Sequence, residues 1–297
     1  MALAPSAHAS SYSFVSLDVP GASDSFVTGI NNSGQIAGYY SNSGSGSPEH
    51  GFIYNGGIFT LFDAPGATAT VATGINNGGQ VVGYYNSASG TNGFTYNGTT
   101  FTSFHAPGSV TLALGINDSG QIVGQTYDDA CCRHGFFDNG GVFTVFNLPG
   151  SSQTTAYGIN NNGQIVGGVE DASGTHGFID NGGVFTTIDV PGAIGTDAIG
   201  INNKGQVVGL YADANNFYHG FVYDGGVFTT LSLPGQVWTE VMGINDVGQI
   251  VGKTLDANGH YHGFFASPVP IPATLWLFGI GLAVWRAFGR RQGKTAA

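Results

Sequence analysis

The chain has 297 residues, of which 51 are glycine, and charged residues make up only 8% of it. Val, Ile, Phe and Tyr recur at regular places among many Gly, Asn, Ser and Thr residues, which excludes a disordered chain and predicts short strands joined by turns. All 18 acidic residues, but only three of the seven basic ones, precede Pro268. This acidic balance excludes nucleic-acid binding, because recognition of phosphates needs a basic surface.

The first ten residues are interpreted as a residual leader. Ala7-His8-Ala9 has the small-x-small form of a signal-peptidase site, although no charged region or apolar core precedes it. We therefore interpret residues 1–10 as the end of a signal peptide, with a disordered Ala-rich leader as the alternative. Ordered structure is expected from about residue 11 onward.

One unit is repeated six times in the body of the chain, which we place at residues 11–267. Its Gly-Ile-Asn start recurs at intervals of 41 to 45 residues. A period of this length with four strand-like runs in each unit is typical of a β-propeller blade. The six starts are at Gly29, Gly74, Gly115, Gly158, Gly200 and Gly243.

Each unit is predicted to contain two hairpins. The Gly-Ile-Asn run and a Gln-Ile/Val run flank a turn of Asn, Asp and Gly, residues that favour tight turns. A Gly-Phe run and a Val-Phe-Thr run flank a second turn, and a Pro-Gly pair should end the fourth strand because proline cannot donate to a strand ladder. The repeated Ile, Val and Phe residues of all four runs are predicted to pack between blades, and the repeated Gly to lie where blades crowd toward the axis.

The two ends of the body are out of phase in a complementary way. The sixth unit stops after its third run, whereas Phe14–Gly21 at the start matches the fourth run at Phe228–Gly235. We therefore predict an all-β fold, a six-bladed β-propeller of four-stranded blades in which the N-terminal strand closes the last blade. A linear β-solenoid or two stacked sheets is the alternative, and no helix is expected before residue 268.

Five units carry a histidine at one shared position, and the sixth unit carries Asn92 there. Equivalent positions on different blades are too far apart to bind one metal ion unless they line the axis. Asn replaces His well as a hydrogen-bonding group but poorly as a metal ligand. We therefore expect a structural role, with each side chain bonding to a neighbouring turn. The histidines are His50, His134, His176, His219 and His262.

The loops between the second and third runs vary most in length, and variable loops on a rigid scaffold are where binding usually occurs. Adjacent Cys131 and Cys132 in one of these loops predict a vicinal disulfide or a bond between molecules, with two incidental thiols as the alternative. Tyrosines near these loops could stack on sugars or pack the blades. The candidate binding residues are Asp128, Asp129, Arg133, Glu170, Asp171 and Trp238.

Signals for catalysis are weak. The sequence contains no Gly-x-Ser-x-Gly, His-Glu-x-x-His or phosphate-binding motif, so we predict no catalytic residue, no metal site and no cofactor. Paired loop carboxylates could serve as acid and base, but solvated charges explain them more simply. Asp171-Ala172-Ser173-Gly174 resembles the start of a calcium loop without the remaining oxygen ligands.

Residues 268–297 differ sharply from the body. A Pro-rich spacer precedes the apolar run Ala273–Trp285, which is followed by basic residues, so a short hydrophobic helix is predicted. The basic end would stay cytoplasmic and leave the body outside, with a helix that caps the propeller as the alternative. The tail resembles the PEP-CTERM sorting signal in its Val-Pro-Leu-Pro-Ala variant. The residues that carry the resemblance are Val269, Pro270, Ile271, Pro272, Ala273, Trp276, Arg290 and Arg291.

This resemblance implies a Gram-negative exported protein that an exosortase processes and that is linked to exopolysaccharide or biofilm matrix. The tail would then anchor the chain in the inner membrane at least transiently. The body resembles the extracellular HAF repeats, with His-Gly-Phe in place of His-Ala-Phe, and this family has no assigned catalytic residues. We therefore expect a non-enzymatic surface or matrix module that binds extracellular polysaccharide or another envelope component. A propeller-type glycan hydrolase or lyase is the alternative.

Overall fold

The computed structural model describes residues 12–43, 48–128 and 132–269. Contacts divide the chain into Phe14–Ser267 and a second part that holds both termini. Strands are the only regular secondary structure among the described residues, and none of these residues form a helix long and apolar enough to cross a membrane. The predicted C-terminal helix and the N-terminal leader lie outside the described residues. The following description concerns Phe14–Ser267.

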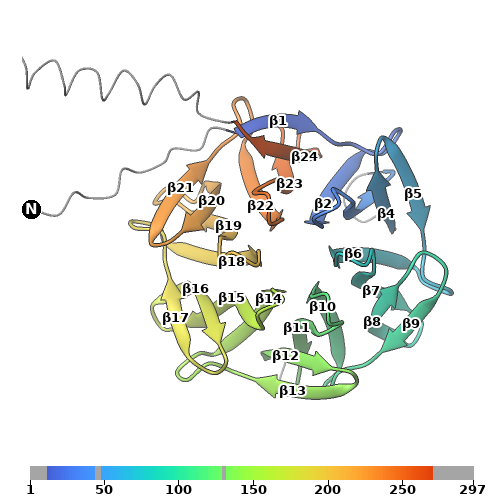
Figure 1. Cartoon of the computed structure of the whole chain (residues 1–297), viewed down its shortest axis with the longest axis horizontal. Helices are drawn as coiled ribbons and strands as arrows, with labels where there is room; N and C mark the ends of the chain where they lie inside the picture. The colour runs from blue at the N-terminus through green and yellow to red at the C-terminus, as the bar shows by residue number, and fades with distance from the viewer. Residues whose placement is uncertain (1–11, 44–47, 129–131, 270–297) are drawn as a thin grey trace, which may run out of the picture. The chain divides into compact units, whose positions relative to one another are not determined.

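The strands form consecutive antiparallel groups of four, which we call units 1 to 6 (Figure 1). Units 1 to 3 contain β2 (Asp24–Ile30), β3 (Ile36–Ser41), β4 (Glu49–Asn55), β5 (Ile58–Phe62), β6 (Ala69–Ile75), β7 (Val81–Ser87), β8 (Gly90–Tyr96), β9 (Phe101–Phe104), β10 (Val110–Ile116), β11 (Ile122–Tyr127), β12 (Arg133–Asn139) and β13 (Val142–Phe146). Units 4 to 6 contain β14 (Gln153–Ile159), β15 (Gln164–Asp171), β16 (Gly174–Asn181), β17 (Phe185–Ile188), β18 (Gly195–Ile201), β19 (Val207–Ala212), β20 (Tyr218–Asp224), β21 (Val227–Leu231), β22 (Trp238–Ile244), β23 (Ile250–Leu255), β24 (Tyr261–Pro268) and the N-terminal β1 (Tyr12–Ser16).

The strand pairing gives four separate four-stranded sheets and one eight-stranded sheet. The larger sheet consists of units 4 and 5, which one parallel residue pair, Thr175 with Gly195, joins. The prediction of separate four-stranded blades is therefore confirmed for four sheets and corrected for this pair. The physical reason is that the backbones of β16 and β18 come close enough to pair at this one position, whereas the other neighbouring units are not joined by strand pairing.

The N-terminal strand completes the last unit, as predicted. β1 pairs with β24, and the Leu17 amide donates to the Gly263 carbonyl at 2.8 Å. At the axis, the Asn245 side chain of unit 6 donates to the Asn31 carbonyl of unit 1 at 3.2 Å. These bonds close the units into the ring of a β-propeller, which excludes the linear solenoid (Figure 1).

The core lies between neighbouring units. The Ile of each Gly-Ile-Asn, the Ile or Val after each Gln and the Phe of each Gly-Phe run are buried. The Phe of the Val-Phe-Thr run was also predicted to pack between blades. This is confirmed for four units, where the ring is partly buried against the core, and wrong for Phe185, which is 38% exposed. The fourth strand lies at the outer edge of its sheet, so this ring packs edge-on against the buried Phe from one side only. Phe14 of β1 makes the same contact with Phe264 at 5.6 Å between ring centroids.

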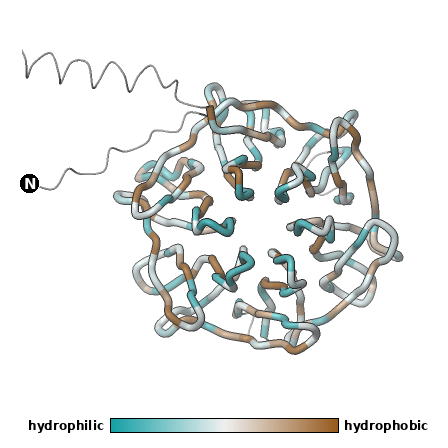
Figure 2. Tube along the Cα trace, in the orientation of Figure 1, coloured by the Kyte–Doolittle hydropathy of each residue, from teal (hydrophilic) through white to brown (hydrophobic). Residues whose placement is uncertain are grey.

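The first strand of every unit lies nearest the axis, and the turns there are hydrophilic (Figures 1 and 2). Each first strand contains a β-bulge just before its Gly-Ile-Asn, at Tyr157 in unit 4 and Ile199 in unit 5. A bulge re-aims the extra side chain and ends regular pairing. The chain direction places all Gly-Ile-Asn turns at one end of the axis, which we call the asparagine end. The starts of the first strands and the variable loops lie at the other end, which we call the loop end.

Candidate functional site

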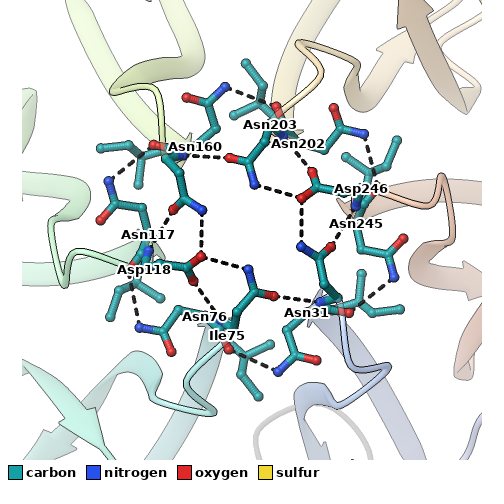
Figure 3. A pocket seen from close by; sticks show the side chains of 18 residues that line it. Asn31, Ile75, Asn76, Asn117, Asp118, Asn160, Asn202, Asn203, Asn245 and Asp246 are labelled. Carbon is teal, nitrogen blue, oxygen red and sulfur yellow. Dashed lines mark hydrogen bonds between the residues drawn. The ribbon is translucent and has the colours of Figure 1, made fainter.

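The asparagine end is built from one residue repeated in all six units. The side-chain amide of Asn160, for example, donates to the Asn202 carbonyl of the next unit at 3.0 Å and to Gln164 Oε1 at 2.8 Å. Its oxygen accepts the amide hydrogens of Asn162 and Gln164, both at 3.0 Å. The donation to the next unit recurs around the whole ring, from Asn31, Asn76, Asn117, Asn160, Asn202 and Asn245 (Figure 3).

A second ring lies beside the first one. Each unit's next residue donates its backbone amide hydrogen to the side-chain oxygen of the same residue in the following unit, always at 2.8 Å. Four members of this ring are asparagines and two, Asp118 and Asp246, are aspartates. Burial opposes the ionisation of Asp118, but hydrogen bonds from Asn77 and Asn161 outweigh it and lower its pKa.

The polar groups at the asparagine end largely satisfy one another. Asp246 accepts side-chain amides from Asn203 and Asn32 at 2.8 and 2.7 Å, and these bonds lower its pKa against the effect of burial. The hollow that the rings surround has a volume of only about 60 Å³. This end therefore acts as a hydrogen-bonded clasp that holds the ring closed.

The glycines of Gly-Ile-Asn form a tight layer between the two ends. A β-carbon at Gly158 would lie 2.6 Å from the Ile199 carbonyl oxygen of the next unit, and one at Gly115 would lie 2.7 Å from the Tyr157 oxygen. The predicted crowding of glycines toward the axis is confirmed. Because any side chain there would collide with a neighbouring backbone, glycine is required at these positions.

On the loop-end side of this layer the six-fold symmetry is broken. The bulge residues line a cavity of about 80 Å³, which has room for only a few water molecules. Thr28 and Thr73 bond to carbonyls of the following unit at 3.0 and 2.9 Å. The other four bulge residues are large and mainly apolar. They are Leu114, Tyr157, Ile199 and Met242.

We call the region around the third residues of the first strands and their partners on the second strands the mouth. In units 1 and 6 this region is aromatic and holds an internal ammonium group. Lys253 forms an ion pair with Glu240 at 3.1 Å, and its Nζ lies 5.5 Å from the centre of the Phe26 ring and 5.3 Å from that of Tyr261. Tyr39 stacks on Phe26 at 4.5 Å. Carboxylate and aromatic faces therefore stabilise a cation together at this mouth.

The other side of the mouth carries the charged residues of units 3 to 5. Arg133 donates to Gln153 and to Glu170. Burial raises the pKa of Asp197 to about 6, Arg133 partly opposes this rise, and Glu170 and Glu240 add to it. Burial and the charge of Asp197 raise the pKa of the Tyr157 hydroxyl well above its usual range.

The candidate binding residues predicted from the loops fall into separate places. Arg133 and Glu170 come together, but Asp128 pairs with His134 at 3.0 Å, and Asp171 accepts hydrogen bonds from Ser173. The bonds from Ser173 lower the pKa of Asp171. Trp238 packs against Tyr218. Asp129 and Cys131 lie outside the described residues, so the disulfide between Cys131 and half-buried Cys132 stays a prediction.

The repeated histidines bond within the edges of their sheets, which confirms the structural interpretation. His50 bonds to Asp63, His176 to Asp189 and His262 to Asp18, at 2.9, 2.8 and 3.2 Å. His219 bonds to Ser232 and Asp213. Within the described ranges, no three His, Cys, Asp or Glu side chains gather closely enough to hold a metal ion.

Sequence reasoning missed Asp197, Tyr157, Glu240 and Lys253. A usable signal was present in the sequence. Asp197, Glu240 and Lys253 are charged, whereas the equivalent residues of the other units are mostly uncharged. At the position of Asp197 and Glu240 the other units have Phe26, Val71, Leu112 and Thr155.

No family model matches the chain, and no curated protein matches it. Solved structures share its fold. A mutant of AofleA from Arthrobotrys oligospora superposes with a TM-score of 0.55 at 12% identity, covering 88% of this chain and 90% of that one. The lectin of Aleuria aurantia, described as a six-bladed β-propeller with a fucose recognition mode, gives 0.51 at 12% identity, covering 84% and 97%. A sialidase from Trypanosoma rangeli gives 0.51 at 10% identity, covering 89% of this chain and 57% of that one. At these identities the likeness shows the propeller fold alone.

Proposed function

We propose that this chain is a non-enzymatic carbohydrate-binding module that a Gram-negative bacterium exports to its surface or biofilm matrix. The observation that carries the proposal is the aromatic pair of Tyr218 and Trp238 at the loop end. Their ring centroids are 5.3 Å apart and the rings stand nearly perpendicular, at 82°. Tyr218 is 37% exposed.

This pair lies where β20 and β22 begin, so two rigid strands of neighbouring units hold it. Phe217 and Val237 beside it are 48% and 41% exposed, which extends the apolar surface. A sugar ring has an apolar face of C–H groups, and rigid amphipathic aromatic rings bind such a face at low entropic cost. The propeller neighbours include a lectin in complex with a fucoside and a sialidase in complex with an inhibitor, which supports a glycan as the ligand.

The proposal extends to the tail on sequence grounds. The Val269–Ala273 segment and Trp276 support recognition by an exosortase, and Arg290 and Arg291 support a cytoplasmic end. The tail would anchor the chain in the inner membrane until it is processed, and the mature module would then reach exopolysaccharide outside. Mass measurement of the mature protein tests this part, because a retained Trp276 would contradict cleavage.

A glycan array with a parallel assay for released sugars tests the binding function. We expect retention of one class of glycan without turnover, and Trp238→Ala should weaken its binding at least tenfold. Phe185→Ala is the matched control, because it removes an exposed ring from the outer strand β17 and should leave binding unchanged. Release of sugar fragments would instead favour the hydrolase or lyase, and equal binding by Trp238→Ala would move the site elsewhere.

A further inference from the structure

Asp197 is an acidic side chain at the loop end that receives no hydrogen bond from the described residues. It is the third residue of β18 and is largely buried, although part of it still reaches solvent. Within the part of the chain that the structure describes, no group donates a hydrogen bond to its carboxylate. A largely buried carboxylate without protein donors is poorly solvated, so a cationic ligand that contacts it would be favoured.

The structure makes room for this carboxylate. Asp197 extends over Gly168 of unit 4, where a β-carbon would overlap its oxygen and would lie 3.5 Å from the Tyr157 ring. Every other unit carries a larger residue at the position of Gly168. These residues are Tyr39, Tyr84, Gln125, Leu210 and Lys253. Unit 4 alone therefore leaves a gap, and the neighbouring unit fills it with a carboxylate.

The charges around Asp197 do not neutralise it. Arg133 is engaged by Glu170 and Gln153, and Lys253 is engaged by Glu240. The Tyr157 hydroxyl stays neutral at neutral pH because its pKa is raised. Both neighbouring cations are therefore already paired, and among the described residues no cation forms an ion pair with Asp197.

The Tyr157 ring connects Asp197 to the cavity of the bulge residues. Tyr157, Ile199 and Met242 line this cavity of about 80 Å³ together with Thr28, Thr73 and the glycine layer. An ammonium group is close to a water molecule in size. Lys253 shows in the same mouth that a carboxylate and aromatic rings stabilise an ammonium.

We propose that Asp197 and the neighbouring Tyr157 ring form a binding site for a primary ammonium group, carried by an amino-sugar residue of a polysaccharide. The choice of an amino sugar rests on the proposed function, whereas recognition of the ammonium group rests on the geometry of the mouth. The site differs from the aromatic pair of Tyr218 and Trp238, which takes the apolar face of a sugar.

Titration calorimetry of the folded chain with a glucosamine tetrasaccharide tests this site, with its N-acetylated form and spermidine as the other two probes. We expect the glucosamine tetrasaccharide to bind and the acetylated form to bind at least tenfold more weakly. Asp197→Asn should lower affinity for the glucosamine tetrasaccharide at least tenfold. Asp224→Asn is the matched control, because it removes an exposed carboxylate from the far end of β20 and should change nothing.

The pH dependence of the affinity gives a second readout. Because Asp197 has a pKa of about 6, the ionised fraction falls about tenfold from pH 7 to pH 5, and affinity should fall about tenfold with it. In Asp197→Asn this dependence should disappear. The groups that face Asp197 are Arg133, Glu170, Glu240 and Tyr157.

Each outcome decides between the proposals. Equal binding of acetylated and free amines, or full binding by Asp197→Asn, would overturn the ammonium site, as would binding of neither amine. Binding of spermidine without the tetrasaccharide would overturn the amino-sugar ligand. Trp238→Ala separates the two functions, because it should abolish binding of neutral glycans but leave the ammonium contact at Asp197 intact.

Discussion

The two ends of the propeller axis use their polar groups in opposite ways. At the asparagine end, six asparagines and the ring beside them donate and accept within the protein, as Asn160 does with both of its side-chain atoms. At the loop end, Asp197 has no donor, and Arg133 and Lys253 are engaged by other carboxylates. Asp197 nevertheless belongs to an inner strand, β18, whose other end leads into the asparagine turn of its unit.

The difference follows from repetition. Where a side chain recurs in all six units, each copy meets the same partner in the next unit, and the ring satisfies itself. Where the side chains differ, as at Gly168 and Asp197, neighbouring units cannot complete one another and polar groups remain for a ligand. Repeated residues therefore build this propeller, and binding is expected where the repeat is broken.

Breaking the asparagine end should give the largest effect. Asn160→Ala removes four hydrogen bonds and leaves buried donors and an acceptor unsatisfied, so we expect a loss of about 3 to 5 kcal/mol in unfolding free energy. Thermal denaturation should show a fall of about 10 °C in melting temperature. Asn162→Ala in the same turn removes only one exposed hydrogen bond, to the Asn203 carbonyl of the next unit at 3.1 Å, and should cost less than about 1 kcal/mol. Equal losses would show that the clasp does not hold the ring.

Removing the charge of Asp197 at the loop end should raise the free energy of unfolding rather than lower it. The pKa of Asp197 is raised to about 6 in the folded state, so the carboxylate destabilises the fold above the ordinary aspartate pKa. Asp197→Asn should therefore stabilise the protein by up to about 3 kcal/mol at pH 7, and the gain should shrink as the pH falls toward 4.

Chemical denaturation at pH 7 and pH 4 measures this gain. Asp224→Asn should not reproduce it, since Asp224 is exposed and accepts a bond from Gln206 at 2.9 Å. A destabilised Asp197→Asn variant at pH 7 would mean that the carboxylate has a structural partner, and the contrast between the two ends would fail.

Most of the fold could be predicted from the sequence because the same pattern of strands and turns recurs in six units. The out-of-phase ends predicted that β1 would complete the last sheet, and Phe14 takes the place of the Phe of other fourth strands. The joining of units 4 and 5 could not be predicted, because it depends on one backbone pair at Gly195. The exposure of the Phe185 ring was also missed, since a run of apolar residues does not say which strand lies at the edge.

Much less of the candidate site could be predicted. Loop length directed attention to Asp128 and Asp171, which bond locally, whereas Asp197 lies inside a strand. Its environment comes from Gly168 and Arg133 of other units, and a single sequence does not show which residues of neighbouring units meet. The aromatic pair was predicted only in part. Trp238 was named as a candidate binding residue, whereas Tyr218 was covered only by the general expectation for tyrosines near the loops.

A substitution in the glycine layer between the two ends should change the free energy of unfolding by a smaller amount. Gly158→Ala places a β-carbon 2.6 Å from the Ile199 carbonyl oxygen, so neighbouring backbones must move apart, at a cost of about 2 kcal/mol. Gly195→Ala is the control, because its nearest neighbour would lie at an ordinary 3.5 Å. Urea denaturation of both variants tests the layer. Similar midpoints would show that the inner strands tolerate separation at the axis.

Substituting one of the repeated histidines should change the free energy of unfolding least. The hydrogen bond to Asp189 raises the pKa of His176, burial opposes this, and the charges of Asp189 and Asp171 add to it. A raised pKa means that the pair stabilises the fold most below the ordinary histidine pKa of about 6.5 and loses this contribution as the pH rises through the folded-state pKa. His176→Asn, which copies Asn92 of unit 2, should therefore cost at most about 1 kcal/mol at pH 5.5 and less at pH 8.5. Denaturation at both pH values in low and high salt measures the difference, and high salt should reduce it because the pair is partly exposed. An equal loss at both pH values would mean that His176 acts by packing alone.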